Sequence, residues 1–342
     1  MKWYHKIVFL IGAGTLPAIV LHAQDIHFSQ FFNSPLLVNP ANTGFIPDGD
    51  YRIGGTYRNQ WSSILQAPYK TMSLFGDAKL FKNKLENGWI GLGAVIISDV
   101  AGTGNLRTNE TYFSLAYHQL LGNASLLTAG FNLGWDSKHI DQSKLTFPDQ
   151  FNGTFFDVTI PTAAVIINNN VHYFDMQVGV NYAYFPDNNT YINGGISLQH
   201  VNQPRETFFT TGSDSYIPIR YIAFASTILK TGKNVIISPA AYYTTQAKSS
   251  ELVGGLNLNY DLSGGGDKQL ILGVYDRLGD AIIPLAGFQL NNIRFTFSYD
   301  VTTSALSNFN NLQGASELNI LQKGSYGSGT TSGEREVLCP KF

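Results

Sequence analysis

The amino-acid sequence predicts an all-β protein: a transmembrane antiparallel β-barrel of about 14 strands, preceded by a short N-terminal plug-like segment. Three observations lead to this prediction. Apolar and polar residues alternate along most of the chain, the alternating segments are longer than the strands of most soluble proteins, and the connections between them are short and long in turn. Charged residues make up 13% of the chain, against roughly 25% in ordinary globular proteins, so its surface is poor in charge although the chain is not apolar overall.

The clearest alternation lies in a hairpin near the C-terminus, over residues 280–301. In its second half, Ile293, Phe295 and Phe297 share one face, whereas the intervening residues are polar. Side chains of a strand point to opposite faces with a period of two. Asn291 and Asn292 separate the two halves, and asparagine tolerates the positive φ of a two-residue hairpin turn. We expect the rest of the chain to repeat this unit.

Residues 1–23 predict a secretory signal peptide that is cleaved after Ala23. Two lysines precede an apolar core over residues 7–20, and a small residue stands before the cut. A permanent membrane anchor fits less well, because the apolar core is short and contains Pro17. The chain is therefore expected to be exported.

Residues 24–48 predict an ordered segment that either plugs the barrel lumen or covers its periplasmic mouth. Phe28, Phe31 and Phe32 would share one face of a helix, since residues three and four apart are neighbours there. Pro35 is expected to end that helix, because proline lacks a backbone N–H and clashes with the preceding turn. A flexible tail is less compatible with so many large apolar residues.

Residues 49–322 are predicted to form the barrel. The candidate strands are residues 50–60, 69–81, 88–98, 109–121, 124–136, 171–185, 190–201, 219–230, 234–245, 251–262, 268–276, 280–290, 293–301 and 314–322. At roughly 3.3 Å per residue and a tilt near 40°, about eleven residues cross the ~25 Å apolar band of an outer membrane. The opposite faces are rich in Gly, Ser, Thr, Asn and Gln, which suits a polar lumen.

The lengths of the connections give an independent check. With the first strand starting in the periplasm, the even-numbered connections are short: residues 82–87, 122–123, 186–189, 231–233, 263–267 and 291–292. All the long connections are odd-numbered: residues 61–68, 99–108, 137–170, 202–218 and 302–313. Outer-membrane barrels have short periplasmic turns and longer outer loops. Two odd connections, 246–250 and 277–279, are short, so the rim is expected to be low there and open to a partner.

Aromatic residues and prolines give local expectations. Aromatic residues near strand ends predict two girdles at the depth of the lipid headgroups. These residues are Tyr57, Trp61, Trp89, Trp135, Tyr184, Tyr191, Tyr221, Tyr242, Tyr260 and Tyr299. Pro239 and Pro284 fall within strands, where proline cannot donate to the ladder, and predict bulges or locally broken pairing.

The search for chemistry finds no catalytic, cofactor-binding or metal-binding motif. The seven histidines lack zinc-site spacing, and no phosphate-binding loop, nucleophile elbow or dinucleotide fingerprint occurs. His118 and His200 are expected to line the lumen with satisfied hydrogen bonds, not to serve a triad. Asp276, Arg277 and Asp280 predict a salt-bridge group at the rim. The net charge of −2 gives no nucleic-acid signal.

Residues 323–342 follow barrel closure and predict a periplasmic tail. Its first part, KGSYGSGTTSG, has the composition of a flexible linker, and EREVLCPKF forms a terminal patch. Cys339 is the only cysteine, so the exported chain has no internal disulfide to form. We expect Cys339 to pack or pair within a periplasmic contact.

Three stretches resemble the PorP/SprF family of Bacteroidetes outer-membrane proteins. They are QDIHFSQFFNSPLLVNPANTG with the later YRNQW, then YDRLGDAIIPLAGF with FSYDVTTSALS, and the terminal CPKF. Two small departures are CPKF in place of the family's CPRF, and Ser316-Glu317 in place of its His-Glu. The resemblance implies a β-barrel of the type IX secretion and gliding system, which helps to secrete or anchor large surface adhesins beside periplasmic ring and peptidoglycan-binding components. It carries over no catalytic residue.

The favoured function is a non-enzymatic barrel in the outer membrane, in contact with lipid, that docks an adhesin's C-terminal domain or periplasmic secretion components. The candidate partner-binding residues are Phe28, Phe31, Phe32, Asp276, Arg277, Asp280, Cys339 and Phe342. The alternative is a passive or substrate-specific porin, which the polar inner face favours. An outer-membrane hydrolase would need a Ser, His and Asp set at the rim, and none can be assembled. A soluble β-sandwich remains the alternative fold, which detergent dependence of extraction would test.

Overall fold

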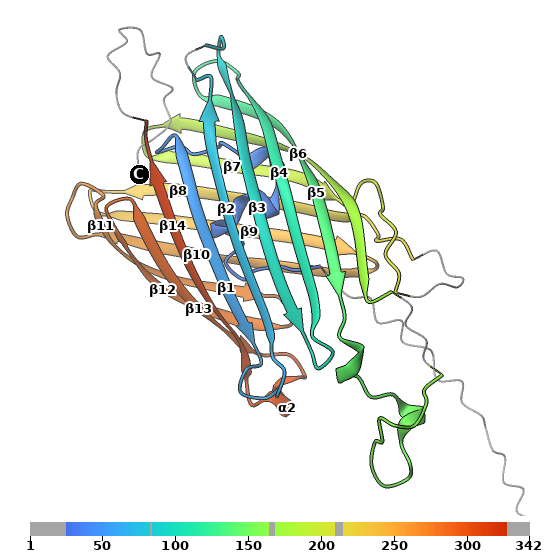
Figure 1. Cartoon of the computed structure of the whole chain (residues 1–342). Helices are drawn as coiled ribbons and strands as arrows, with labels where there is room; N and C mark the ends of the chain where they lie inside the picture. The colour runs from blue at the N-terminus through green and yellow to red at the C-terminus, as the bar shows by residue number, and fades with distance from the viewer. Residues whose placement is uncertain (1–24, 83, 164–167, 209–214, 327–342) are drawn as a thin grey trace, which may run out of the picture.

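The computed structural model describes residues 25–82, 84–163, 168–208 and 215–326. The predicted signal peptide with its cleavage after Ala23, and the tail residues Cys339 and Phe342, lie outside these ranges. Within them, fourteen antiparallel strands form one closed barrel in sequence order (Figure 1). No helix among these residues is long and apolar enough to cross a membrane.

The strands agree closely with the alternating segments of the sequence. They are β1 (Tyr51–Gln60), β2 (Tyr69–Leu80), β3 (Gly88–Ala101), β4 (Leu106–Leu120), β5 (Ser125–His139), β6 (Asn170–Asp187), β7 (Thr190–Gln199), β8 (Arg220–Thr231), β9 (Val235–Gln246), β10 (Ser249–Asp261), β11 (Lys268–Arg277), β12 (Ala281–Leu290), β13 (Ile293–Thr302) and β14 (Gln313–Gly324). Short helices occur outside the barrel wall: η3 (Gln142–Lys144), η4 (Pro148–Gln150) and α2 (Ser307–Asn310).

The first and last strands close the barrel. β1 pairs antiparallel with β14 over its whole length, from Tyr51 opposite Gly324 to Gln60 opposite Ala315. Closure leaves no strand edge unpaired, which is the condition for a sheet in hydrocarbon, where no water can satisfy backbone groups. The predicted barrel, with its 14 strands, is confirmed.

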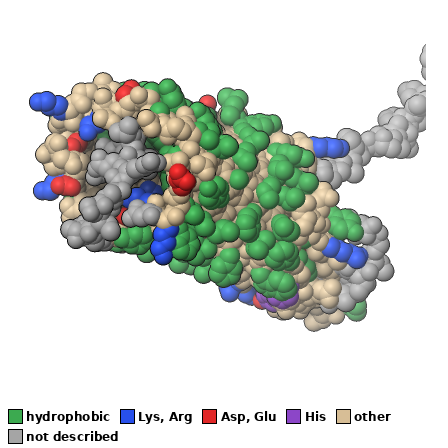
Figure 2. Space-filling model, turned by 90° about the horizontal axis from the view of Figure 1, so that it is seen from above, with side chains coloured by type: hydrophobic (Ala, Val, Ile, Leu, Met, Phe, Trp, Pro, Cys, Tyr) green, Lys and Arg blue, Asp and Glu red, His purple; other side chains and the backbone are tan. Residues whose placement is uncertain are grey.

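The two faces of the wall differ as the alternation predicts. Leu74, Phe113 and Ile196 point outward and are 53%, 67% and 61% exposed, whereas Asn132 and Ser298 point inward and are fully buried. Figure 2 shows hydrophobic side chains spread over the side of the barrel, with charged ones mostly toward its ends. An apolar outer wall of this kind matches the lipid-facing band of an outer-membrane barrel.

The long connections are again odd-numbered and the even-numbered ones short, as predicted, with one change. The strands β3 and β4 extend further than expected, so the connection between them shrinks to residues 102–105. The connections over residues 247–248 and 278–280 are short, which gives the low rim that the sequence predicts. We call the end with the even-numbered turns the turn end and the other the loop end. In outer-membrane barrels the turn end faces the periplasm.

Each of the two prolines interrupts the pairing of its strand with one neighbour. Pro239 of β9 pairs with Leu256 of β10. On its other side, the pairing of β9 with β8 is interrupted at Pro239, between Ser226 and Leu229 of β8. Pro284 likewise pairs with β11, whereas the β12–β13 register skips it. Each proline therefore keeps one neighbour and loses pairing with the other, because it lacks the donor. The locally broken pairing is confirmed. A register shift between β13 and β14 at Tyr299/Val301 lies beside the Pro284 gap, and another occurs between β6 and β7 at Tyr184/Asp187.

The prediction of two aromatic girdles is wrong for three residues. Trp89, Tyr191 and Tyr242 are 4%, 4% and 5% exposed and point into the lumen. Tyr57, Trp135, Tyr184, Tyr221 and Tyr260 lie on the outer face, as expected. The three inward rings pack against the N-terminal segment, a partner that strand-end position alone does not reveal.

The N-terminal segment, which we define as residues 25–50, passes through the barrel lumen (Figure 1, dark blue). It contains η1 (Phe31–Asn33), α1 (Pro35–Val38) and η2 (Pro40–Asn42). The expected helix is reduced to η1, which leaves out Phe28 and ends before Pro35 as predicted, and Pro35 then begins α1. Proline suits the first helical position, where its missing N–H has no intrahelical acceptor to lose. Of the two expected placements, inside the lumen or over its periplasmic mouth, the segment lies inside the lumen.

Candidate functional site: the plugged lumen

The lumenal segment is held by apolar residues that pack against the inner wall. Phe31 stacks on Tyr242 with ring centroids 5.3 Å apart, and Phe32 stacks on Tyr275 at 5.0 Å. Leu36 is fully buried among side chains of β2, β3, β4 and β14. Phe45 forms a third cluster with inward residues of β3, β5, β6 and β7. The lumen is therefore not purely polar, as the alternation suggested, but apolar where the segment touches it.

The first of three anchors is a buried ionic network that holds the segment to the last strand, β14. The carboxylate of Glu317 in β14 accepts hydrogen bonds from the backbone N–H groups of Ser29 and Gln30, at 2.9 and 2.8 Å. Arg58 bridges Glu317 at 3.2 Å and Asp300 at 2.8 Å. The Ser29 hydroxyl donates to Asp300. Glu317 is fully buried, so its charge is balanced by protein groups and not by water, and it ties three chain segments together.

The predicted rim group is only partly assembled. Arg277 reaches Asp280 at 3.2 Å, but it also pairs with Asp300 at 3.1 Å and donates to the Ser29 hydroxyl at 2.7 Å. Asp276 is exposed on the opposite face of β11 and does not share the arginine. The grouping of Asp276 with the pair is therefore wrong, because adjacent strand residues face opposite sides. Arg277 belongs to the anchor of the lumenal segment.

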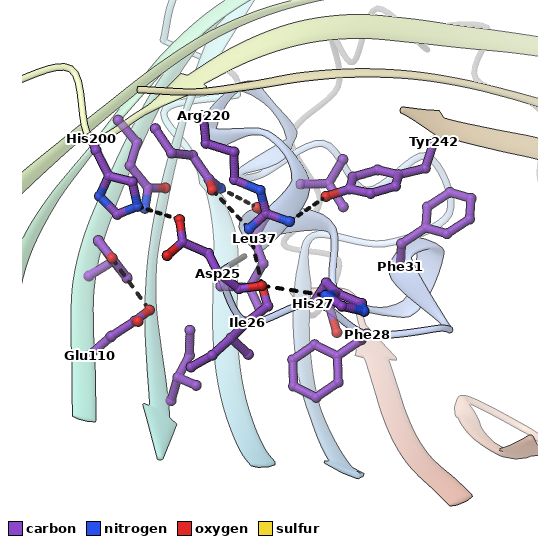
Figure 3. A pocket seen from close by; sticks show the side chains of 16 residues that line it. Asp25, Ile26, His27, Phe28, Phe31, Leu37, Glu110, His200, Arg220 and Tyr242 are labelled. Carbon is purple, nitrogen blue, oxygen red and sulfur yellow. Dashed lines mark hydrogen bonds and ion pairs between the residues drawn. The ribbon is translucent and has the colours of Figure 1, made fainter. Parts of the chain in front are cut away.

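A second anchor holds the start of the described segment near the loop end (Figure 3). The Asp25 carboxylate lies 2.7 Å from Nε2 of His200, whose Nδ1 lies 2.9 Å from Asp175. Arg220 donates to the carbonyl of Ile26 and to the hydroxyl of Tyr242. His200 follows the last residue of β7, outside the spanning strand. The prediction that it lines the lumen with satisfied hydrogen bonds is confirmed.

The second anchor is expected to weaken at alkaline pH. Burial alone would lower the pKa of His200, but hydrogen bonds and charge attraction from Asp175 and Asp25 outweigh it and raise the pKa to about 10. A raised pKa stabilises the anchor fully below the ordinary histidine value near 6.5, and this contribution is lost as the pH rises through about 10. Burial lowers the pKa of His27 to about 4, so it does not titrate in this window. Amide hydrogen exchange of residues 25–29, corrected for intrinsic rates, should therefore accelerate from pH 6.5 to 10.

The His200→Gln variant is the control for this pH dependence. Its residues 25–29 should exchange faster than those of the wild type at pH 6.5 and should show a much smaller pH-dependent change. An equal pH dependence in wild type and variant would contradict the assignment to His200.

A third anchor lies toward the turn end. The Thr43 carbonyl lies 2.7 Å from Nε2 of His118, a buried histidine whose Nδ1 contacts Thr128. The backbone N–H of Gly44 donates to Asp77, and its carbonyl accepts from Trp89. A Cβ on Gly91 would lie 1.9 Å from the Thr43 carbonyl oxygen, so only glycine admits this approach. His118 is thus satisfied in the lumen, as predicted.

The sequence-predicted partner residues fall into three groups. Phe28 and Phe31 are buried, and Phe32 is half-buried, so a partner could reach them only if the segment moved. Arg277 and Asp280 lie at the end of the first anchor. Cys339 and Phe342 lie outside the described residues. Among the described residues, no cluster of three His, Cys, Asp or Glu is placed to hold a metal ion.

The sequence reasoning missed the residues that anchor the segment. Arg58, Asp300 and Glu317 are charged residues at inward positions of strands, and they meet although they are far apart in the sequence. The available signal was the charge itself, since an inward carboxylate or guanidinium in a lumen needs a partner. The identity of that partner could not be read from strand periodicity.

Comparison with known proteins gives the following findings. A family model described as type IX secretion system membrane protein PorP/SprF matches residues 20–321. No curated protein matches. The crystal structure of the Pseudomonas putida toluene transporter TodX is 12% identical, with 84% of this chain and 92% of that chain covered and a TM-score of 0.52. A TodX monoaromatic hydrocarbon channel deltaS2 mutant is also 12% identical, with 84% and 93% covered and a TM-score of 0.50. At this identity the two structures support the barrel fold alone.

Proposed function

Because the chain belongs to the PorP/SprF family of type IX secretion system membrane proteins, we propose that it acts as a non-enzymatic docking barrel for secreted surface adhesins. In this role it binds an adhesin's C-terminal domain or periplasmic secretion components, and so helps to secrete or anchor the adhesin. The observation that carries the proposal is a family match across residues 20–321 combined with a lumen occupied by an anchored segment. An occupied lumen suits a scaffold better than an open pore.

Exposed apolar side chains at the loop end support a docking role. Phe151, Phe155, Phe156 and Val158 lie on the connection between β5 and β6 and are 48%, 59%, 52% and 65% exposed. Exposed apolar groups gathered outside the lipid-facing wall are a common feature of protein interaction sites. The low rim at residues 247–248 and 278–280 gives a partner access from the same end.

Deletion of residues 334–342 is expected to lower the surface display of a cognate adhesin while the barrel still assembles. The reason is that this terminal patch, with Cys339 and Phe342, is proposed to bind on the periplasmic side. The measurement is adhesin on intact cells, by antibody labelling, with barrel assembly checked by heat-modifiable migration. Deletion of residues 327–333 is the matched control, because it shortens the linker and keeps the patch.

Two outcomes separate the docking faces. Normal display after deletion of 334–342, with loss of display in a Phe155→Ser, Phe156→Ser double variant, would move docking from the tail to the loop end. Normal display in both would contradict the docking proposal. The porin alternative predicts steady single-channel conductance of the wild-type barrel, whereas a plugged scaffold should be nearly silent.

A further inference from the structure

A cavity remains beside the lumenal segment, in the half of the barrel toward the turn end. Its volume is about 220 Å³, and it lies between the segment and inward residues of β1, β7–β11, β13 and β14. An apolar cavity of about 150 Å³ is enough to bind benzene. The space therefore has room for a small organic molecule.

The cavity continues into a vestibule at the turn end. A second space of about 190 Å³ is lined by the turns at residues 265–267 and 291–292, and it shares Asp48, Arg294 and Lys323 with the first. A molecule from the periplasmic side would therefore pass Asp267 and then these three charged residues before reaching the inner cavity.

The pairing of the cations at this passage singles out Arg294 as the group that can take an acidic ligand. Lys323 pairs with Asp48 at 2.8 Å, and Arg52 pairs with Asp77 at 2.7 Å, so each of these cations already has a carboxylate. The guanidinium of Arg294 donates only to the neutral side-chain amide of Gln289 among the described residues, at 2.9 and 3.1 Å. Arg294 makes no direct ion pair among the described residues, although Asp48 attracts it at longer range, and the Nη1 group of its guanidinium has no acceptor among them. A planar guanidinium suits a carboxylate ligand, which it can hold with two hydrogen bonds.

The inner wall favours an organic body behind that charge. Phe32, Phe224, Ile228, Ile236 and Ile271 supply apolar surface to the cavity. Asn193, Asn257 and Tyr275 also line the cavity, so a few polar residues lie beside the apolar ones. The wall therefore suits an occupant with a mainly apolar body.

We propose that this cavity binds a small amphipathic carboxylate, such as an aryl-substituted short-chain acid, that enters from the turn end. The carboxylate lies on Arg294, next to Lys323, and the ring packs against Phe32 and Phe224. This site is separate from the docking role proposed above, and it requires neither an adhesin nor the tail.

The test is equilibrium binding of 3-phenylpropionate to the full-length mature barrel in lipid nanodiscs, by titration calorimetry. 3-Phenylpropanol and 3-phenylpropylamine are the neutral and cationic probes of matched shape. The carboxylate should bind about tenfold more tightly than the alcohol, the effect of one charge-assisted hydrogen bond, and the amine should bind most weakly.

Variants of residues that line the cavity test whether the probes bind there. Arg294→Gln should remove the preference for the carboxylate over the alcohol, and Arg294→Lys should keep part of it. Ser226→Phe should weaken all three probes by filling the cavity, because Ser226 lines it. Arg205→Gln is the matched control, since Arg205 is exposed beyond β7 at the loop end. Equal binding of acid and alcohol to the wild type, an unchanged preference in Arg294→Gln, or no binding at millimolar probe would each overturn the proposal.

Discussion

Replacing Glu317 by alanine is expected to release the lumenal segment and make the barrel conduct. The Glu317 carboxylate accepts the backbone N–H groups of Ser29 and Gln30 and pairs with Arg58, and the side chain is fully buried. Truncation would leave two backbone donors and a guanidinium without this acceptor in a site that excludes water. Removing one partner of a buried ion pair typically costs about 3–5 kcal/mol.

The barrel wall should survive this change. The pairing of β14 with β1 and β13 uses backbone groups, and the Glu317 side chain points inward, away from lipid. The cost therefore falls on the lumenal segment, whose packing and other anchors must hold without the Glu317 carboxylate. We expect long conducting events in planar bilayers and faster hydrogen exchange of residues 25–33, with normal heat-modifiable migration.

Two further variants make this test specific. Glu317→Gln keeps one acceptor oxygen and the shape of the side chain, so it should lie between the wild type and the alanine variant. Glu206→Ala removes the carboxylate of a partly exposed pair with Lys138 at the loop end, at 2.7 Å, and pairs of this kind contribute about 0–1 kcal/mol. If Glu317→Ala stayed as silent and as protected from exchange as Glu206→Ala, the anchor role would be refuted.

Replacing Val178 by arginine is expected to destabilise the barrel by about 2–4 kcal/mol, the cost of a cation at the midplane of a lipid-facing wall. Val178 lies midway along β6 (Asn170–Asp187), opposite Phe131 of β5 and Leu198 of β7, and its side chain points outward. Arginine there places its charge in hydrocarbon or distorts the bilayer around it. Equilibrium unfolding from lipid vesicles by guanidinium chloride measures the difference.

Val158→Arg is the matched control for this prediction. Val158 is more exposed than Val178 but lies on the connection between β5 and β6, outside the wall. Surface substitutions in such places usually change stability by less than about 0.5 kcal/mol. Equal effects of the two substitutions would mean that the outer wall does not meet hydrocarbon.

The strand predictions succeeded because they depend only on residues within the same strand. In Ile293–Thr302, every second residue from Thr296 to Thr302 is buried on the inner face, and Phe297 is exposed on the outer one, as alternation alone indicates. A residue's side of the sheet depends only on its parity within the strand. The 14 strands, their order and the short turns could therefore be predicted without knowledge of any distant contact.

The lumenal segment shows where such reasoning stops. Its composition indicated an ordered plug, yet the expected helix covers only η1 and a second one, α1, begins at Pro35. Trp89, Tyr191 and Tyr242 point inward toward that segment instead of toward lipid. Their orientation follows from contacts between residues that are far apart in the sequence. The same holds for Asp276, which faces away from Arg277 and Asp280.

The sequence by itself determined that the chain forms a closed β-barrel with an apolar outer wall, because a period of two and the lengths of strands and turns are local properties. Only the tertiary structure decided what fills the lumen and how it is held. The bond from Ser29 to Glu317 joins residues 288 positions apart, and strand periodicity carries no information about which inward carboxylate meets which part of the segment. Those pairings follow from closure, which brings β14 beside β1 and encloses the segment within a low-dielectric lumen where each buried charge needs a partner.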